Sequence, residues 1–525
     1  MERLGVTNIF VEKYISTDWA DEFQTRHSRV LRDLPKWVPR IHFFKSDTMG
    51  SARLRRQDLL RIADLVANGV EYLGFCVVRP YQPGPFAPPS IGETVLMPPR
   101  TALRVLPSIG DMAQVSDSLP TCCRTNFHAH ILGREIDVAG MPFIQQDRAV
   151  SVCAEADLWM IARYMHELGH VRRYRPSEME RLAQKSGPTS PTREGLEAHQ
   201  IFTALHEMGL HPDLVSPANA FDAVSLISAH TWSGVPVIAS LGNKGRTNHV
   251  VTIVGCTYSR NRRSWDFRPR DFPVSMADYV SHVLVHDDQK GPYHSLAVGS
   301  RKSRDDRFHR LTLNGQPVFD LVFPGYPRVH LREEDVRLIA REWTQSIIPE
   351  QFMWPGGRMW SKNDMQKYVL RPYLLRSDLF KRRAWEIGSQ VYGFWHGRRG
   401  DMPRQWGPLD WGAEYYVQQM LPRFVWVVDF VTPPEDVADP LLTDMVWGEM
   451  VFDSTAHFQD SMSSLLSFRL LGRMMWLDEP GEERPNRRVS WATRDYDSRD
   501  WSGAPDLYSG PYPSFLARPG VYGSK

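Results

Sequence analysis

The 525-residue chain is poor in cysteine and has no long apolar run. The five cysteines are odd in number and scattered: Cys76, Cys122, Cys123, Cys153 and Cys256. This usage excludes a dense disulfide framework and favours a reducing compartment. No stretch approaches the roughly 18 apolar residues of a membrane-spanning helix, and the first residues lack the apolar segment and cleavage site of a secretory signal. We therefore expect a cytoplasmic protein with no membrane partner.

An excess of charge of one sign is also missing. The chain carries 63 basic and 61 acidic residues, which gives a formal net charge of +2. Nucleic-acid binding usually depends on a concentrated basic surface, and the charged run at residues 301–310 mixes both signs. We expect no nucleic-acid partner. Oligomeric state is left open by the sequence.

The composition that is present is that of a folded protein with a large core. Apolar residues make up 42% of the chain and charged residues 24%, with 17 Trp and 39 Pro. A chain of this length exceeds what one hydrophobic core usually serves. We predict an α+β protein in four regions: an N-terminal helical then β-rich module at 1–140, a central domain at 141–305, a C-terminal α+β region at 306–478, and a polar, loosely packed tail at 479–525.

Hydrophobic periodicity and turn residues predict the elements of each region. In the first module we expect helices at 19–34 and 55–67 and strands at 72–78, 94–97, 102–106 and 127–138, the last turning at Gly133. In the centre we expect helices at 153–169, 177–184, 195–208 and 220–230 and strands at 236–241, 249–258 and 283–286. Further on we expect helices at 333–345 and 363–379 and strands at 423–431 and 445–452.

The central region contains the residue types of nucleophilic catalysis by a thiol. Cys153 begins a helix that is apolar on nearly every side, and a helix amino terminus favours the reactive thiolate. A polar loop with hydrogen-bonding glutamines, QQDRAVS, precedes it. His249 starts the apolar run HVVTIVGC and is a candidate base, while Asp287 follows the strand VLVH and could orient the imidazole. Asp288 is the alternative.

The order and spacing of these segments resemble the papain-like cysteine peptidases, closest in pattern to the bacterial type that processes bacteriocin leader peptides. The matching segments are QQD, VCAEADLWM, PSEMERLAQ, SGVPVIASLGN, NHVVTIVGC and VLVHDDQKGPY. The resemblance implies a central buried helix packed on an antiparallel sheet at 141–305. It also implies cleavage of a peptide or related amide bond in a peptide or protein substrate, through a thioester and without a cofactor. Some members of this superfamily are instead acyl or glutamyl transferases, or have lost activity.

The resemblance assigns a role to each candidate residue. Cys153 would be the nucleophile, His249 the general base and Asp287 the residue that orients it. A glutamine about six residues before the cysteine usually helps to hold the oxyanion. Here Asp147 occupies that position, so Gln146 is favoured and Gln145 stays open. Each of these residues alone also fits a purely structural role, and only their combination indicates catalysis.

A competing motif ends the same helix. The segment His166-Glu167-Leu168-Gly169-His170 matches the H-E-x-x-H zinc-peptidase signature, in which two histidines on one helical face bind Zn²⁺. The metzincin extension is missing, because Arg173 and Pro176 stand at its positions. Downstream residues that could supply a third ligand are Glu194, Glu197 and His199. We favour a helix end here and keep a zinc metallopeptidase as the runner-up hypothesis, with a catalytically silent scaffold for partner binding as the third.

Overall fold

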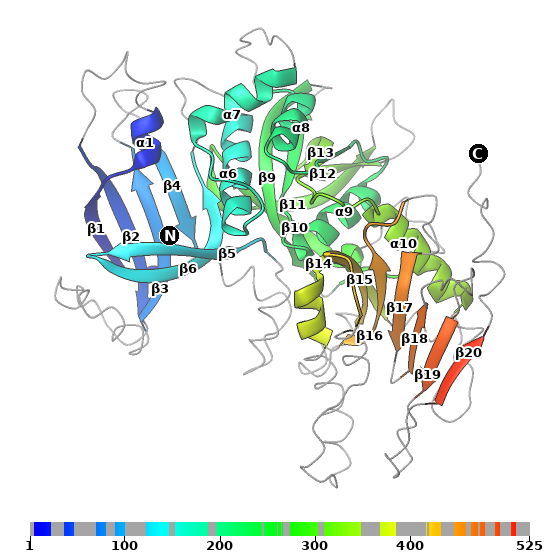
Figure 1. Cartoon of the computed structure of the whole chain (residues 1–525). Coiled ribbons are helices and arrows are strands. Elements are labelled where there is room, and N and C mark those ends of the chain that lie inside the picture. Colours follow the sequence, from blue (N-terminus) through cyan, green and yellow to red (C-terminus); the bar gives the residue numbers. More distant parts are fainter. Residues whose placement is uncertain are drawn as a thin grey trace.

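The computed structural model describes residues 5–22, 36–46, 70–79, 90–99, 122–145, 153–186, 196–243, 246–259, 261–263, 265, 273–302, 309–347, 368–384, 416, 419–431, 446–457, 464–470, 473–477, 489–493 and 506–510. This part of the chain is a mixed α+β protein with three antiparallel sheets that follow one another along the sequence (Figure 1). Across the described residues, none of the helices has the length and apolar character needed to cross a membrane.

The first sheet has six strands in the order β1-β2-β3-β4-β6-β5. Its elements are β1 (Asn8–Tyr14), α1 (Thr17–Glu22), β2 (Val38–Ser46), β3 (Val70–Val78), β4 (Ile91–Leu96), β5 (Thr125–Ile131) and β6 (Arg134–Phe143). Strands β5 and β6 form the predicted hairpin, which turns at Gly133 with a φ of +79°. Such a left-handed conformation favours glycine. The apolar side chains of one sheet face form a core that includes Phe44, Phe75 and Phe127.

The prediction of a helical start to this module is only partly right: α1 matches the start of the helix predicted at 19–34, but the other described residues of this part include two strands. Residues 8–14 and 38–46 are strands that pair with each other along their whole length. Both contain β-branched and aromatic residues that suit a pleated surface, and they pair with each other although they are distant in sequence. The rest of the helix predicted at 19–34, the helix predicted at 55–67 and the strand predicted at 102–106 lie outside the described residues.

The second sheet has seven strands in the order β12-β11-β10-β9-β8-β13-β7. Its strands are β7 (Asp213–Val215), β8 (Val237–Asn243), β9 (Arg246–Tyr258), β10 (Val280–Asp287), β11 (Gly291–Lys302), β12 (His309–Leu313) and β13 (Gln316–Phe323). The helices of this region are α6 (Cys153–Glu167), α7 (Pro176–Ala183), η3 (Gln184–Ser186), α8 (Ala198–Glu207), α9 (Ala220–Trp232) and η4 (Met276–Tyr279). All four predicted helices and all three predicted strands of the centre are confirmed.

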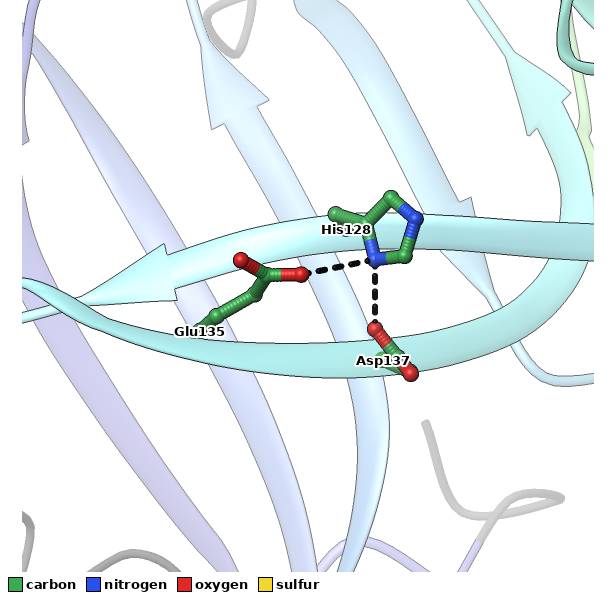
Figure 2. A group of neighbouring side chains, drawn as sticks. All are labelled: His128, Glu135 and Asp137. Carbon is green, nitrogen blue, oxygen red and sulfur yellow. Dashed lines mark hydrogen bonds and ion pairs between the residues drawn. The ribbon is translucent and has the colours of Figure 1, made fainter.

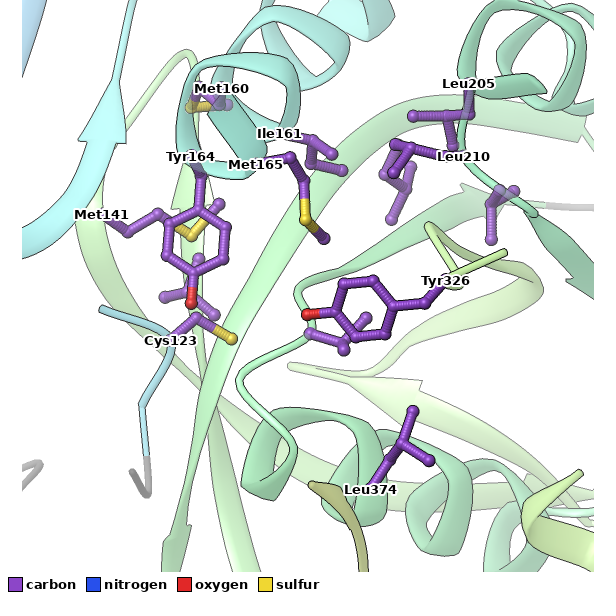
Figure 3. Packing of buried hydrophobic residues seen from close by; sticks show 14 of the residues in the cluster. Cys123, Met141, Met160, Ile161, Tyr164, Met165, Leu205, Leu210, Tyr326 and Leu374 are labelled. Atoms are coloured by element: carbon purple, nitrogen blue, oxygen red, sulfur yellow. The ribbon is translucent and has the colours of Figure 1, made fainter. Parts of the chain in front are cut away.

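Helix α6 is buried on nearly all sides because it contacts two sheets at once. It packs on β9 of the second sheet and on β5 and β6 of the first. Figure 3 shows Tyr164 and Met165 of α6 surrounded by Met141, Cys123 and Tyr326 from other parts of the chain. The helix ends as predicted near Gly169, whose φ is +75°. A helix held this firmly fixes the position of its first residue.

The third sheet is a meander in the order β14-β15-β16-β17-β18-β19-β20 (Figure 1). Its strands are β14 (Val369–Arg376), β15 (Phe424–Val431), β16 (Val446–Asp453), β17 (Leu465–Leu470), β18 (Arg473–Leu477), β19 (Val489–Thr493) and β20 (Asp506–Gly510). The helix α10 (Glu333–Glu342), continued by the π-helical turn η5 (Trp343–Ile347), precedes it. The predicted helix at 333–345 and the strands at 423–431 and 445–452 are confirmed.

One prediction for this region is wrong. Residues 369–376, predicted as helix, form β14, and helical residues begin only at 377. β14 pairs with β15 in full register, and Pro372 within it would disrupt a helix. In the tail, residues 489–493 and 506–510 form β19 and β20 of the sheet, and its other residues lie outside the described part of the chain. Its polar composition hid these strands because one face of an antiparallel sheet can meet water.

Candidate active site

Cys153 is the first residue of α6. The first four backbone N–H groups of a helix have no partner within the helix, and their dipoles favour negative charge at that end. A thiol placed there is therefore more easily ionised. The residues that anchor the helix, among them Leu158, Met160 and Ile161, have no exposed surface.

His249 and Asp287 come together because neighbouring antiparallel strands bring the start of one beside the end of the other. His249 lies near the start of β9 and Asp287 is the last residue of β10. His249 Nε2 and Asp287 Oδ1 are 3.2 Å apart. The His249 side chain is 14% exposed and that of Asp287 is 1% exposed. The pair thus combines a carboxylate shielded from water with an imidazole that still reaches the surface.

Local backbone donors hold the Asp287 carboxylate in place. Its Oδ1 accepts hydrogen bonds from the backbone N–H groups of Gln289 (3.0 Å) and Lys290 (3.2 Å). Lys290 Nζ lies 3.5 Å from the other oxygen. Burial acts to raise the pKa of Asp287, but the hydrogen bond and charge of His249, with help from Gln289 and Lys290, lower this pKa to about 2. Asp287 is therefore a fixed anion at neutral pH.

Asp288 is the second carboxylate near the imidazole. Its Oδ1 lies 3.9 Å from His249 Nε2, and its side chain is fully buried. Asp287 is the nearer of the two and has the hydrogen-bond distance. One donor atom from each of His249, Asp287 and Asp288 lies within 4.8 Å of the others, a spacing that could also hold a metal ion. The geometry therefore allows an oriented base and, as a second possibility, a metal-binding group.

The second ring nitrogen of His249 is Nδ1. Nδ1 is buried and has no hydrogen-bond partner among the residues that the structure describes. When a carboxylate binds Nε2–H of a neutral imidazole, Nδ1 is left as the acceptor. His249 can therefore take a proton at Nδ1 while Asp287 holds Nε2.

The two glutamines expected to hold the oxyanion differ in what the structure says of them. Gln146 lies outside the described residues. Gln145 is bound to the start of β4, since its Oε1 accepts from the N–H of Ile91 (3.0 Å) and its own N–H donates to the Ile91 carbonyl (3.0 Å). Arg79 Nη1 also donates to the Gln145 carbonyl at 2.8 Å. These bonds give Gln145 a structural role at the start of β4.

Asp157 is a further buried group beside the site that the sequence analysis missed. It lies one helical turn after Cys153 and has no exposed surface. Thr252 of β9 donates a hydrogen bond of 2.6 Å to Asp157 Oδ1. Burial raises the pKa of Asp157 well above its usual range, and the charges of Asp288 and Asp287 add to this effect. The available signal was an acidic residue within the first turns of a helix whose other side chains are mostly apolar.

The zinc-peptidase signature at residues 166–170 lies at the end of α6, where its two histidines are separated by the helix terminus. The helix ends at Glu167, so His170 lies beyond it and does not share a helical face with His166. His166 Nδ1 donates to the Val171 carbonyl (3.0 Å). The His170 ring lies 4.5 Å from that of Tyr326, and burial, with the charges of Arg423 and Arg376, lowers its pKa to about 4.

Within the described part of the chain, the residues of the signature do not form a metal-binding group. Glu167 is paired with Arg163. Among the described residues, neither His166 nor His170 belongs to a group of three side chains that could hold a metal ion. Of the downstream candidates, Glu194 lies outside the described residues, and Glu197 pairs with His199 at 3.2 Å on the exposed start of α8.

Comparisons with known proteins give little further information. No family model matches the chain, and no curated protein matches it. Among solved structures, the chain is similar to the peptidase domain of Streptococcus ComA, a bifunctional ABC transporter involved in a quorum-sensing pathway. The match has 12% sequence identity and a TM-score of 0.21, and it covers 35% of this chain and 97% of that domain. A likeness of this size carries no argument about function, which must come from the residues of the site.

Proposed function

We propose that the protein is a papain-like cysteine peptidase whose catalytic domain spans residues 141–305. Cys153 is the nucleophile, His249 the general base and acid, and Asp287 the residue that orients the imidazole. The observation that carries the proposal is the 3.2 Å contact between His249 Nε2 and Asp287 Oδ1, with Nδ1 of the same ring left without a partner among the described residues. A catalytic histidine needs one ring nitrogen held by the carboxylate and the other available to accept the proton of the nucleophile.

The position of Cys153 supports the same conclusion. It begins the buried helix α6, which packs against β9, the strand that carries His249. A helix amino terminus favours the thiolate, and an adjacent imidazole can accept the thiol proton. The four other cysteines are all buried and free. Burial raises the pKa of Cys76 to about 11 and those of Cys122 and Cys256 to about 12, which makes them poor nucleophiles.

The reaction follows from these positions. The Cys153 thiolate attacks the carbonyl carbon of the scissile amide, and the protonated His249 gives its proton to the leaving amine as the C–N bond breaks. The acyl group is then held as a thioester. His249 next takes a proton from water, whose oxygen attacks the thioester carbonyl, and the thiolate leaves. Gln146 and the backbone N–H of Cys153 are the proposed donors to the oxyanion.

The test is alkylation of the full chain with limiting iodoacetamide between pH 5 and 9, with the modified thiol located by mass spectrometry. We expect Cys153 to react first, with appreciable labelling near pH 6, because a thiolate–imidazolium pair exists below the usual thiol pKa. His249→Ala should remove the labelling at low pH. His282→Ala is the matched control, since this histidine lies exposed on β10 and should leave the profile unchanged.

Two other outcomes have distinct meanings. Equally slow labelling of all five cysteines would refute the nucleophilic role of Cys153. Peptide hydrolysis that resists alkylation and is abolished by a chelator would instead favour metal chemistry, for which His249, Asp287 and Asp288 have the spacing. If the protein hydrolyses no peptide and Cys153 shows no preferential alkylation, a catalytically silent scaffold would be favoured.

A further inference from the structure

The outward face of the β5–β6 hairpin carries four side chains of metal-ligating type. His128 and His130 are exposed on β5, and Glu135 and Asp137 are exposed on β6. In the register of the hairpin, His128 is opposite Asp137 and His130 is opposite Glu135. Directly opposed residues place their Cβ atoms about 5 Å apart on the same face. The four side chains therefore form one compact group.

The contacts within this group converge on one nitrogen (Figure 2). His128 Nδ1 lies 2.7 Å from Asp137 Oδ1 and 3.1 Å from Glu135 Oε1. The donor atoms of these three residues all lie within 4.8 Å of one another. His130 Nε2 is 3.8 Å from the second oxygen of Glu135. Two carboxylates and an imidazole thus point at one another, with a second imidazole beside them.

The opposite face of the hairpin holds this group in place. Phe127, Ala129 and Ile131 of β5 and Ile136 and Val138 of β6 are buried in the core of the first sheet. Side chains alternate between the two faces of a strand, so burying these five residues presents the four polar ones to solvent. The backbone of the site is therefore fixed, while the ligand side chains are free to adjust.

The chemistry of the donors selects the ion. Imidazole nitrogen with carboxylate oxygen is a donor set that suits Zn²⁺. Two carboxylates balance a divalent charge when both imidazoles are neutral. Zinc bond lengths of about 2.0–2.2 Å require neighbouring ligand atoms to lie a little more than 3 Å apart. The observed separations need only a small outward adjustment of exposed side chains.

We propose that the β5–β6 hairpin is a surface binding site for a divalent transition-metal ion, Zn²⁺ by preference, with His128, Glu135 and Asp137 as ligands and His130 as a fourth. The site does not depend on the proposed peptidase activity. The competing explanation is a protonated His128 held by two carboxylates, an ion pair that needs no metal and contributes little to stability at the surface.

Titration of the full-length protein with Zn²⁺ alone, followed by isothermal calorimetry, separates the two explanations. We expect one Zn²⁺ per chain at this site, and at least a tenfold weaker affinity in His128→Ala and in Asp137→Asn, since even loss of a group that supports a ligand costs about tenfold or more. All four side chains are 58–61% exposed, so these variants should keep the fold. Circular dichroism verifies this.

Two controls make the result specific. His199→Ala removes an exposed histidine paired with a single carboxylate, Glu197, at 3.2 Å, and should leave Zn²⁺ affinity unchanged. His249→Ala removes a residue of the second group with metal-binding spacing among the described residues and should leave the hairpin site occupied. Unchanged Zn²⁺ affinity in both His128→Ala and Asp137→Asn would overturn the proposal, as would loss of the ion only in His249→Ala.

Discussion

Thr252 and Asp157 connect the strand of the proposed base to the helix of the proposed nucleophile through a hydrogen bond of 2.6 Å. Both side chains have no exposed surface. Thr252 lies three residues after His249 on β9, and Asp157 lies four residues after Cys153 on α6. This hydrogen bond helps to fix the distance between helix α6 and strand β9, and so between Cys153 and His249, which must lie close together to form a thiolate–imidazolium pair.

Asp157→Asn should be more stable than the wild type at neutral pH, whereas Asp157→Ala should be less stable. Burial and the nearby carboxylates raise the pKa of Asp157 well above its usual range. The unfolded chain ionises above about pH 4 while the folded chain keeps the proton, so this residue reduces stability as pH rises. The advantage of Asn should grow by at most about 1.4 kcal/mol per pH unit above pH 4. Thermal unfolding at pH 4.5 and pH 7 measures it.

The alanine variant tests the hydrogen bond itself. Removing the acceptor leaves the buried Thr252 hydroxyl unpaired, which costs about 1–3 kcal/mol. If Asn destabilises as much as Ala, the group is needed as an anion and the account given for Asp157 is wrong.

Asp287→Asn should slow alkylation of Cys153 at pH 6 by at least about tenfold, and Asp288→Asn should slow it less. Asp287 is the carboxylate at hydrogen-bond distance from His249, and Asp288 is 0.7 Å farther, at 3.9 Å against 3.2 Å. An amide cannot stabilise the imidazolium that keeps Cys153 ionised. The rate constant of iodoacetamide labelling at Cys153 gives the comparison. A larger effect of Asp288→Asn would transfer the orienting role to that residue.

Asp287 should also make the protein sensitive to acid. Its folded-state pKa of about 2 lies below the usual value of 3.8, so the ionised carboxylate stabilises the fold fully above about pH 4. This contribution, roughly 2 kcal/mol, is lost as the pH falls through 2. The unfolding temperature of the wild type should therefore fall more steeply between pH 4 and pH 2 than that of Asp287→Asn. Parallel curves for the two proteins would contradict the prediction.

Asp429→Ala should destabilise the third sheet by about 3–5 kcal/mol, because it would leave two buried arginines without their counter-ion. Asp429 Oδ2 accepts hydrogen bonds from Arg371 (2.8 Å) and Arg383 (2.6 Å), and all three residues are nearly inaccessible. Asp378→Ala is the control. It breaks a 2.7 Å pair with Arg376 in which both side chains are largely exposed, and should change stability by less than about 1 kcal/mol.

Amide hydrogen-exchange rates in β15 distinguish local opening of the third sheet in Asp429→Ala from unfolding elsewhere in this long chain. Faster exchange confined to β14, β15 and β16 is the expected pattern. Equal effects of Asp429→Ala and Asp378→Ala would show that the buried cluster is not what holds these strands together.

The sequence by itself determined the elements whose signal is local. The helix that begins at Cys153 is apolar on nearly every side up to Ala162, which is sufficient to predict the buried helix α6, and the apolar runs of β9 and β10 are sufficient to predict those strands. These elements depend on residues within a few positions of one another, which is why their pattern can be read without the fold. The candidate triad of Cys153, His249 and Asp287 came instead from the order of these segments along the chain and their resemblance to papain-like peptidases.

Only the tertiary structure decided the features that depend on distant partners. β1 pairs with β2, and β14 pairs with β15 although a helix was predicted over its residues. The approach of His249 to Asp287 rather than Asp288, and the neutral buried state favoured for Asp157, depend on register and desolvation. Strand pairing, burial and charge coupling join residues far apart in sequence, and no periodicity in the chain records them.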